Sequence, residues 1–320
     1  MQRKNTDSLV FMAPMAGITD RPFRSIIHDC GEGNLISEMV AVNAIQRKNP
    51  KSYKIADVRP ENYPVTVQMV GNSPELFAEA AKFIYELGAA ALDINMGCPV
   101  KKIINNNSGS ALMKDTCLAA KIIEATVKAT PLKVSVKFRK GWDNEHVNAV
   151  DFAKMCEQSG ASRITIHGRT RAQGYSGFAD WNIIAEAKSA VKIPVIGNGD
   201  IDSAKKAKEM MQKYGVDGVM VGRALLGNPW LLNKIHHFLE TGEELKNPNT
   251  ADIKEMLLRH LELLVEYYGE RNGLSVSRKH IGWYVKSLYE AKRFREQYTK
   301  LVVYDEAVDL INNFFAKVEE

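Results

Sequence analysis

Short apolar segments rich in β-branched residues recur along this chain, and each ends in a glycine, an asparagine or a polar turn. Amphipathic stretches with helical spacing separate most of them, at the intervals of roughly 25–40 residues that are typical of βαβ units. The eight strand-like segments begin near Leu9, Asn34, Pro64, Ala91, Lys133, Arg163, Ile193 and Gly218. Eight such units predict an α/β fold that closes into a (β/α)8 barrel. A doubly wound open sheet is the alternative, but no GxGxxG motif follows the first strand.

The pattern changes after Leu239, where the polar stretch ETGEELKNPNTAD has the composition of a linker. Beyond it, the apolar positions have helical spacing and no strand alternation. The sequence therefore predicts a barrel domain over residues 1–240 and a small all-helical domain over residues 250–320.

Polar side chains follow the same alternation on four neighbouring predicted strands. In VTVQ, LDIN, VSVK and ITIH, the branched apolar residues share one face and the polar residues share the other. The apolar face should pack on the helices, so the polar face should look into the barrel. We therefore expect Gln68, Asn95, Lys137 and His167 to point into the carboxyl-terminal mouth, where barrel enzymes keep their active sites.

Two later strands end in glycine-containing turns, GNGD at Gly197–Asp200 and VGR at Val221–Arg223. Backbone N–H groups in the loops after strands seven and eight commonly bind phosphate in this fold, and Arg223 would add a fork of donors. The same glycines would also serve in ordinary tight turns. The compact stretch Pro14–Met15–Ala16, after the first strand, suits a flat aromatic ligand lying against the backbone.

Composition and charge change this picture little. The net charge of +5 permits a polyanionic partner without requiring one. The cysteines at 30, 98, 117 and 156 form no CxxC pair and no zinc-type cluster, which favours a reducing, cytoplasmic location and no metal. No uninterrupted apolar stretch approaches the ~18 residues of a membrane span.

Several motifs together resemble the tRNA-dihydrouridine synthase family, with the bacterial B-type as the nearest pattern. They are APMAGITDRPFR, QMVG, DINMGCPVKK, VKFRKG, HGRTRAQGYSGFADW, IPVIGNGDI, VGRALLGNPW and RKHIGWYVK, and they span nearly the whole chain in order. DINMGCP and HGRTRAQGYSG are the most specific of them.

The resemblance implies FMN in the barrel mouth, with NADPH as the electron donor and NADH not excluded. Its ring would lie against Pro14, Met15 and Ala16, and Gln68 would bind its polar edge. Lys137 would stabilise the negative charge of the reduced ring. His167 would contact the cofactor, and the phosphoribityl chain would be held by Asn198, Gly199, Asp200, Gly222 and Arg223.

The resemblance also gives Cys98 a role in reducing the C5–C6 double bond of specific uridines in tRNA. Reduced FMN would supply a hydride to C6, and the Cys98 thiol, protonated near neutrality, would supply a proton to C5. Asn95 would orient the uracil and Lys101 would attract phosphate. Cys30, Cys117 and Cys156 are interpreted as small buried apolar residues.

The predicted helical domain carries eight basic and two acidic residues between Arg271 and Lys300. Basic residues neutralise nucleic-acid phosphates, and the resemblance implies that this domain, with Arg278 and Lys279, binds tRNA. Trp283 is expected in the helix core, and no stable protein partner is implied. The alternatives are an FMN barrel acting on a free pyrimidine, like dihydroorotate dehydrogenase, and a non-catalytic RNA-binding role.

Overall fold

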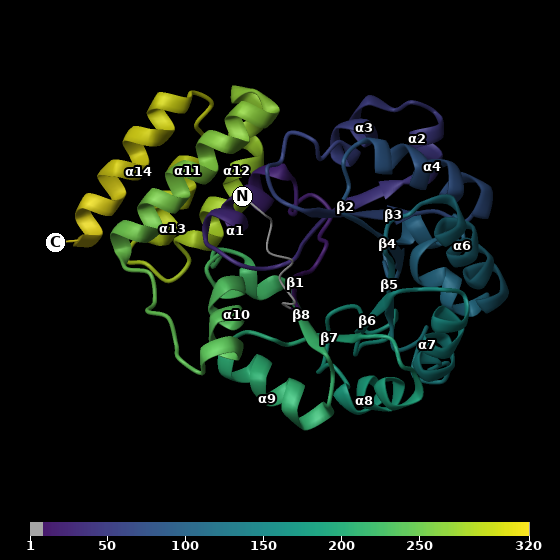
Figure 1. Cartoon of the computed structure of the whole chain (residues 1–320). Coiled ribbons are helices and arrows are strands. Elements are labelled where there is room, and N and C mark those ends of the chain that lie inside the picture. The colour runs from purple at the N-terminus through teal and green to yellow at the C-terminus, as the bar shows by residue number, and fades with distance from the viewer. Residues whose placement is uncertain (1–8, 320) are drawn as a thin grey trace. The chain divides into compact units, whose positions relative to one another are not determined.

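The computed structural model describes residues 9–319 and contains one eight-stranded parallel sheet (Figure 1). The strands are β1 (Val10–Met12), β2 (Leu35–Ala41), β3 (Val65–Val70), β4 (Ala91–Met96), β5 (Val134–Arg139), β6 (Arg163–His167), β7 (Val195–Asn198) and β8 (Gly218–Val221). Consecutive strands are neighbours from β2 to β8, and β8 pairs with β1. Backbone bonds of 2.9 Å from Met12 N to Asn34 O and from Asn34 N to Val10 O close the ring. The predicted (β/α)8 barrel is confirmed.

Helices connect successive strands, and Figure 1 shows α4, α6, α7, α8 and α9 around the outside of the sheet. The helical elements of the barrel are α2 (Val42–Gln46), α3 (Pro50–Ala56), α4 (Pro74–Glu86), α5 (Lys101–Ile104), the 3₁₀ helix η1 (Gly109–Lys114), α6 (Thr116–Ala129), α7 (Ala149–Gln158), α8 (Trp181–Ala190) and α9 (Ala204–Tyr214). Five of these helices start where a side-chain oxygen accepts a backbone N–H: Asn49, Ser73, Asp115, Asp180 and Ser203.

Both faces of the sheet are buried. Apolar strand residues such as Val67 and Ile94 have no exposed surface, as expected of strands that pack against helices. The barrel interior also holds polar side chains, including Gln68, Asp93 and Ser135, each at most 2% exposed. Buried polar groups are costly unless they are hydrogen-bonded, so this interior must be a connected network.

The chain divides into two compact units. The first comprises the residues up to Asp20 together with Gly33–Gly222. The second joins Arg21–Glu32 to the segment from Arg223 onward. Its elements are α1 (Arg21–Asp29), the 3₁₀ helix η2 (Arg223–Leu225), α10 (Leu231–Thr241), α11 (Thr250–Tyr268), α12 (Glu270–Tyr284), α13 (Ala291–Tyr298) and α14 (Tyr304–Glu319). The predicted carboxyl-terminal helices are therefore present, and the functional boundary between residues 240 and 250 stays a prediction.

The core of the second unit is apolar, with Leu257, Ile281 and Phe315 almost fully buried. Helix α1 belongs to this unit because Phe23 packs against the rings of His260 and His280, with centroids 5.8 and 5.7 Å away. These two histidines lie 4.5 Å apart, centroid to centroid. A pair of buried titratable rings therefore lies in the helical core.

All four cysteines are free thiols. Cys156 is buried, as predicted, and Cys30 is half-buried. The prediction for Cys117 was wrong, because it lies exposed in the first turn of α6, on the side away from the buried Ala119 and Ile122.

Within residues 9–319, no helix is long and apolar enough to cross a membrane. The same part of the chain has no cluster of three or more His, Cys, Asp or Glu side chains suited to a metal ion.

Candidate active site at the barrel mouth

The strand register sets the polar strand ends opposite one another in pairs that are stepped along the barrel, because Lys137 is opposite Thr165 and His167 is opposite Arg139. Asn95 is opposite Lys137 across the β4–β5 pair, and His167 is opposite Asn198 across the β6–β7 pair. Gln68 lies one step deeper, opposite Asp93. The alternation read from the sequence therefore places these side chains around the carboxyl-terminal end of the barrel.

A chain of short hydrogen bonds links three of these residues. Gln68 Nε2 donates to Asp93 Oδ2 at 2.7 Å, and Asn95 Nδ2 donates to Gln68 Oε1 at 2.8 Å. Ser135 Oγ donates to the other oxygen of Asp93 at 2.6 Å. Burial raises the pKa of Asp93, although the Gln68 and Ser135 hydrogen bonds oppose this shift. The network fixes the orientation of both amides.

The turn that carries Cys98 is held from several sides. Asn95 Oδ1 accepts from the backbone N–H groups of Gly97 and Cys98, at 3.1 and 2.9 Å. The carbonyl oxygen of Cys98 accepts from Ser110, through its N–H at 3.2 Å and its hydroxyl at 2.9 Å. Gly109 packs so closely that an added Cβ would lie 3.1 Å from Cys98 Cβ. The thiol is therefore half-buried on a turn with few alternative positions.

Burial raises the pKa of the Cys98 thiol, while a backbone hydrogen bond from Val100 and the charges of Arg139 and Lys137 act in the opposite direction. A thiol with a raised pKa stays protonated at neutral pH, so it is suited to give a proton rather than to attack as a thiolate.

Lys137 is a largely buried cation beside this thiol. Its Nζ donates to Asn198 Oδ1 at 3.1 Å, and Asn198 Nδ2 donates to the carbonyl of Met220 at 2.8 Å. Burial, followed by the charge of Arg139, lowers the pKa of Lys137 to about 8. An ammonium group has three N–H donors, so the described bond to Asn198 leaves donors for an anionic ligand.

The loop after β1 is compact. Thr19 Oγ1 accepts from the N–H of Met15 at 3.0 Å, and Glu38 accepts from the N–H of Gly17. Pro14 and Met15 are half-buried, whereas Ala16 is exposed. A Cβ added at Gly222, the residue after β8, would lie 3.9 Å from the sulfur of Met15. The structure thus brings the predicted ring-binding loop next to the predicted phosphate-binding turn.

The turn after β7 depends on an unusual backbone. Gly199 has φ +130° and Asp200 has φ +59°, and a Cβ on Gly199 would clash with Ala179 at 2.5 Å. Both carboxylate oxygens of Asp200 accept from Arg169 Nη2, at 2.7 and 2.9 Å. His167 is buried nearby, 3.3 Å (Cδ2) from the position of that added Cβ. The side chain of Asp200 is therefore engaged within the protein.

Four further predicted residues make none of the hydrogen bonds described above. Lys101 is exposed at the first position of α5. Arg223, also exposed, begins η2 and is the first residue of the second unit's long segment. Arg278 and Lys279 are half-buried on α12. Lys101 belongs to the first unit, and the other three residues belong to the second.

Two arginines that sequence reasoning missed hold the loop after β6. Arg139 is 3% exposed and donates to the carbonyls of Gly97 (2.8 Å), Thr170 (3.0 Å) and Gly174 (2.9 Å). Arg169 is 2% exposed and donates to the carbonyls of Ser176 and Gly177 as well as to Asp200. For Arg139 the sequence signal was a charged residue at the end of a buried strand, whereas Arg169 lies in the loop that follows β6.

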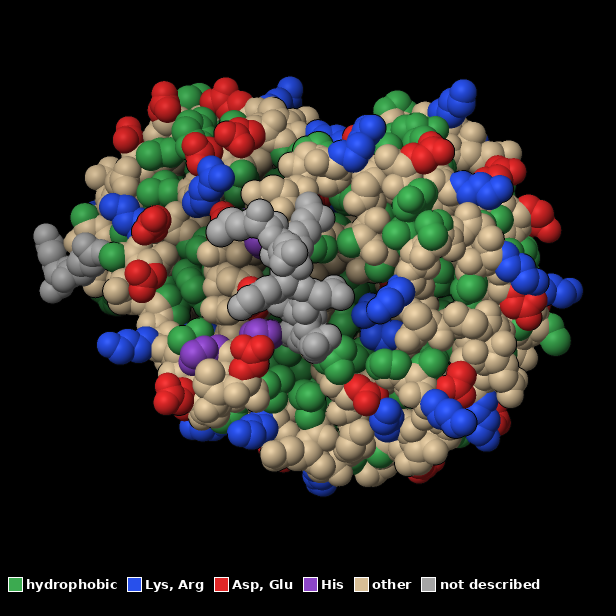
Figure 2. Space-filling view, in the orientation of Figure 1, with side chains coloured by type: hydrophobic (Ala, Val, Ile, Leu, Met, Phe, Trp, Pro, Cys, Tyr) green, Lys and Arg blue, Asp and Glu red, His purple; other side chains and the backbone are tan. Residues whose placement is uncertain are grey.

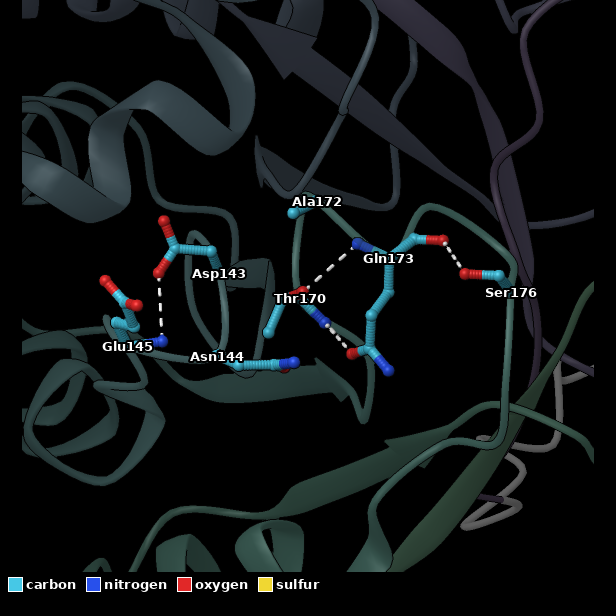
Figure 3. A pocket seen from close by; sticks show the side chains of 7 residues that line it. All are labelled: Asp143, Asn144, Glu145, Thr170, Ala172, Gln173 and Ser176. Atoms are coloured by element: carbon cyan, nitrogen blue, oxygen red, sulfur yellow. Dashed lines mark hydrogen bonds between the residues drawn. The ribbon is translucent and has the colours of Figure 1, made fainter.

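A polar pocket of 530 Å³ opens between the loops after β5 and β6 (Figure 3). Its lining residues are Asp143, Asn144, Glu145, Thr170, Ala172, Gln173 and Ser176. Thr170 and Gln173 bond to each other twice, and Ser176 Oγ donates to the carbonyl of Gln173. The pocket walls are therefore largely preformed.

The face drawn in Figure 2 has Lys and Arg side chains interspersed with Asp and Glu. On that face, charge alone does not mark a binding surface.

Comparison with known proteins gives a consistent result. The family described as Dihydrouridine synthase (Dus) matches residues 11–319. A probable tRNA-dihydrouridine synthase of Rickettsia conorii is 49% identical over 289 residues, which is 90% of this chain and 87% of that protein. The tRNA-dihydrouridine synthase B of Pseudomonas aeruginosa is 43% identical over 308 residues, 96% of this chain and 93% of that protein.

Solved structures resemble the chain in fold. Histamine dehydrogenase from Rhizobium sp. 4-9 is 11% identical, with a TM-score of 0.56 over 80% of this chain. The match covers 49% of that larger protein.

Proposed function

Because the chain belongs to the dihydrouridine synthase family, we propose that it reduces the C5–C6 double bond of specific uridines in tRNA to 5,6-dihydrouridine. The single observation that carries this proposal is the half-buried Cys98 thiol, fixed on its turn within the electrostatic reach of Lys137. The family match extends through the helical segment to residue 319, which a free-pyrimidine enzyme leaves unexplained.

The donor set at the mouth fits a flavin mononucleotide. Lys137 is a buried ammonium whose pKa is lowered by burial and by the charge of Arg139, and a ligand with an anionic edge would stabilise its charged form. Gln68 Nε2 keeps a second N–H for a ring carbonyl. Pro14, Met15 and Ala16 would lie along the ring and His167 beside the cofactor. The residues proposed for the phosphoribityl chain are Asn198, Gly199, Asp200, Gly222 and Arg223, with Asp200 acting through its backbone.

When bound and reduced, FMN supplies the hydride equivalent that C6 of the base requires. The protein's own contribution is the proton. Cys98, neutral because burial raises its pKa, gives its S–H proton to C5, and solvent then reprotonates the thiolate. Asn95 Oδ1 already accepts from two backbone N–H groups of this turn, and its Nδ2 donates to Gln68, so it would orient the uracil through the second Nδ2 hydrogen, whose one described contact is with Met39 Sδ at 3.9 Å.

Substrate binding would use both units. Lys101 is exposed near Cys98 in the chain and would attract a phosphate, while Arg278 and Lys279 on α12 would neutralise phosphates of the folded tRNA. NADPH is the proposed electron donor, with NADH as the alternative, and the cytoplasm is the proposed location because tRNA is found there.

The decisive experiment incubates the purified protein with FMN, unmodified tRNA and either NADPH or NADH, followed by nucleoside mass spectrometry of the tRNA. Dihydrouridine at defined positions supports the proposal, and the faster nucleotide identifies the donor. Reduction of free uracil or oxidation of dihydroorotate at rates that tRNA does not change would instead favour the free-pyrimidine alternative.

A further inference from the structure

Two aromatic side chains in the loop after β6 are exposed beside the candidate active site. Phe178 is 88% exposed and Tyr175 is 57% exposed. A phenylalanine ring left in water contributes little to the stability of the fold. Exposed apolar groups close to a functional site commonly mark a binding surface.

The loop that carries these rings is held rigidly despite its exposure. Arg139 donates to the carbonyl of Gly174, and Arg169 donates to the carbonyls of Ser176 and Gly177. Both guanidinium groups are almost fully buried. A surface that is already ordered loses less conformational entropy when a partner binds, so the loop is prepared for recognition.

The same arginine connects this loop to the thiol. Arg139 Nε donates to the carbonyl of Gly97, the residue before Cys98, while its Nη1 holds Thr170 and Gly174. Its guanidinium also lies 5.8 Å from the ring centre of Tyr175. The position of the aromatic loop is therefore fixed relative to the Cys98 turn.

The chemistry around the loop suits a nucleic acid strand. Arg171, in the same loop, and Lys114, from η1, lie over the Trp142 ring at 4.4 and 4.5 Å, and so bring positive charge to the rim. The pocket in Figure 3 instead has carboxylates, Asp143 and Glu145, which repel phosphate and accept hydrogen bonds from base amino groups.

A uridine that enters the barrel must leave its base stack, and its neighbours then lose a stacking partner. Single-stranded RNA bases stack on exposed aromatic rings and present their edges to polar groups. We propose that Phe178 and Tyr175 form a stacking platform for a nucleotide next to the reduced uridine, with the adjacent polar pocket receiving a base edge. This inference rests on the proposed function and identifies where the flanking RNA strand binds.

The test compares Phe178→Ala with Phe178→Trp, and uses Tyr85→Ala as the control. Tyr85 is 49% exposed on α4, in the same unit, and its removal should leave the KM for tRNA unchanged. Loss of one base–aromatic stack should raise the KM for tRNA about 5- to 100-fold in Phe178→Ala, while Phe178→Trp stays near the wild-type value. An unchanged KM in Phe178→Ala overturns the platform.

A second measurement places a photoreactive benzoylphenylalanine at position 178 and, as the control, at position 85. Cross-links from position 178 should map to nucleotides adjacent to the uridine that becomes dihydrouridine. Cross-links only to distant nucleotides, or none, overturn the inference. If the wild-type protein forms no dihydrouridine in tRNA, the proposed function itself fails, and this outcome is distinct from an active enzyme with an unchanged KM.

Discussion

Nε2 of Gln68 donates a hydrogen bond of 2.7 Å to Oδ2 of Asp93, and both side chains are buried inside the barrel. The bond forces the amide oxygen of Gln68 toward Asn95, whose own oxygen holds the backbone of Gly97 and Cys98. A carboxylate with no direct contact to the thiol turn therefore determines how that turn is supported.

Replacing Asp93 with Ala should slow catalysis through this network. Alanine has no side-chain acceptor, so Gln68 Nε2 and Ser135 Oγ both lose the oxygen to which they donate, at a cost of about 1–3 kcal/mol in stability for each. Misplacement of the Cys98 turn should lower kcat for tRNA reduction by up to about 100-fold. Ser135→Ala is the matched control, because it removes one bond to Asp93 and leaves the Gln68–Asn95 link in place. Equal kcat values in the two variants would contradict a positioning role for Asp93.

Cys98→Ala should reduce dihydrouridine formation about 100- to 10,000-fold, the range expected when a general acid is lost. Mass spectrometry of tRNA from timed reactions measures this effect. Cys117→Ala, at an exposed thiol on α6, should behave like the wild type. Since burial raises the pKa of Cys98, the wild-type rate should stay flat through neutral pH and fall only in alkaline solution. Full activity in Cys98→Ala would exclude the thiol as the acid.

FMN affinity should decrease above about pH 8, because Lys137 loses its proton there in the ligand-free protein. Burial lowers the pKa of Lys137 to about 8, so the side chain is a cation below pH 8 and neutral well above it. Fluorescence titration with FMN between neutral and alkaline pH measures the change, which can reach about tenfold per pH unit. Lys137→Met should bind weakly at every pH, whereas Lys133→Met, at the exposed opposite end of β5, should keep the wild-type profile. A pH-independent affinity in the wild type would count against Lys137 as the cation.

The helical unit should lose stability in mild acid. Burial lowers the pKa of His260 to about 3 and that of His280 well below its ordinary value, and the charge of Lys279 acts in the same direction. Both rings stay neutral in the folded protein but take up protons in the unfolded chain below about pH 6.5. Stability is therefore fully present above that pH and falls as the pH drops toward 3, by about 1.4 kcal/mol per pH unit for each histidine.

Urea unfolding followed at several pH values tests this expectation. His280→Phe removes one titrating ring from a contact with Phe23 and should make the acid loss shallower. His237→Gln, on α10 of the same unit and outside the His260–His280 pair, should leave the slope unchanged. Identical slopes in all three proteins would show that the buried pair does not control the acid response.

Binding of tRNA should weaken as the salt concentration rises. The double variant Arg278→Gln with Lys279→Gln should reduce the slope of the logarithm of the binding constant against the logarithm of the salt concentration by about one for each lost phosphate contact. Lys82→Gln with Lys121→Gln, at two exposed lysines on α4 and α6, is the control for net charge. Filter binding across a salt series gives both slopes. A double variant with the wild-type slope would remove these two residues from the proposed tRNA surface.

Local sequence patterns are sufficient to predict the barrel and the residues at its mouth. The alternation in VTVQ, LDIN, VSVK and ITIH is a local property of each strand, and closing the sheet brings Asn95 opposite Lys137 without further information. The turn at Gly97–Cys98–Pro99 is equally local, because glycine and proline restrict the backbone at their own positions.

The groups that support the mouth could not be predicted from the sequence, because they depend on contacts made in the tertiary structure. Arg139 binds carbonyl oxygens of distant segments, whereas Arg169 binds carbonyls further along its own loop, and a carbonyl has the same chemistry whichever residue carries it. Asp93 could be recognised as inward-facing from its strand, but its partners come from β3 and β5. The exposure of Cys117 and Phe178 likewise depends on which helix or loop surface the rest of the chain covers, and residue type alone does not specify that.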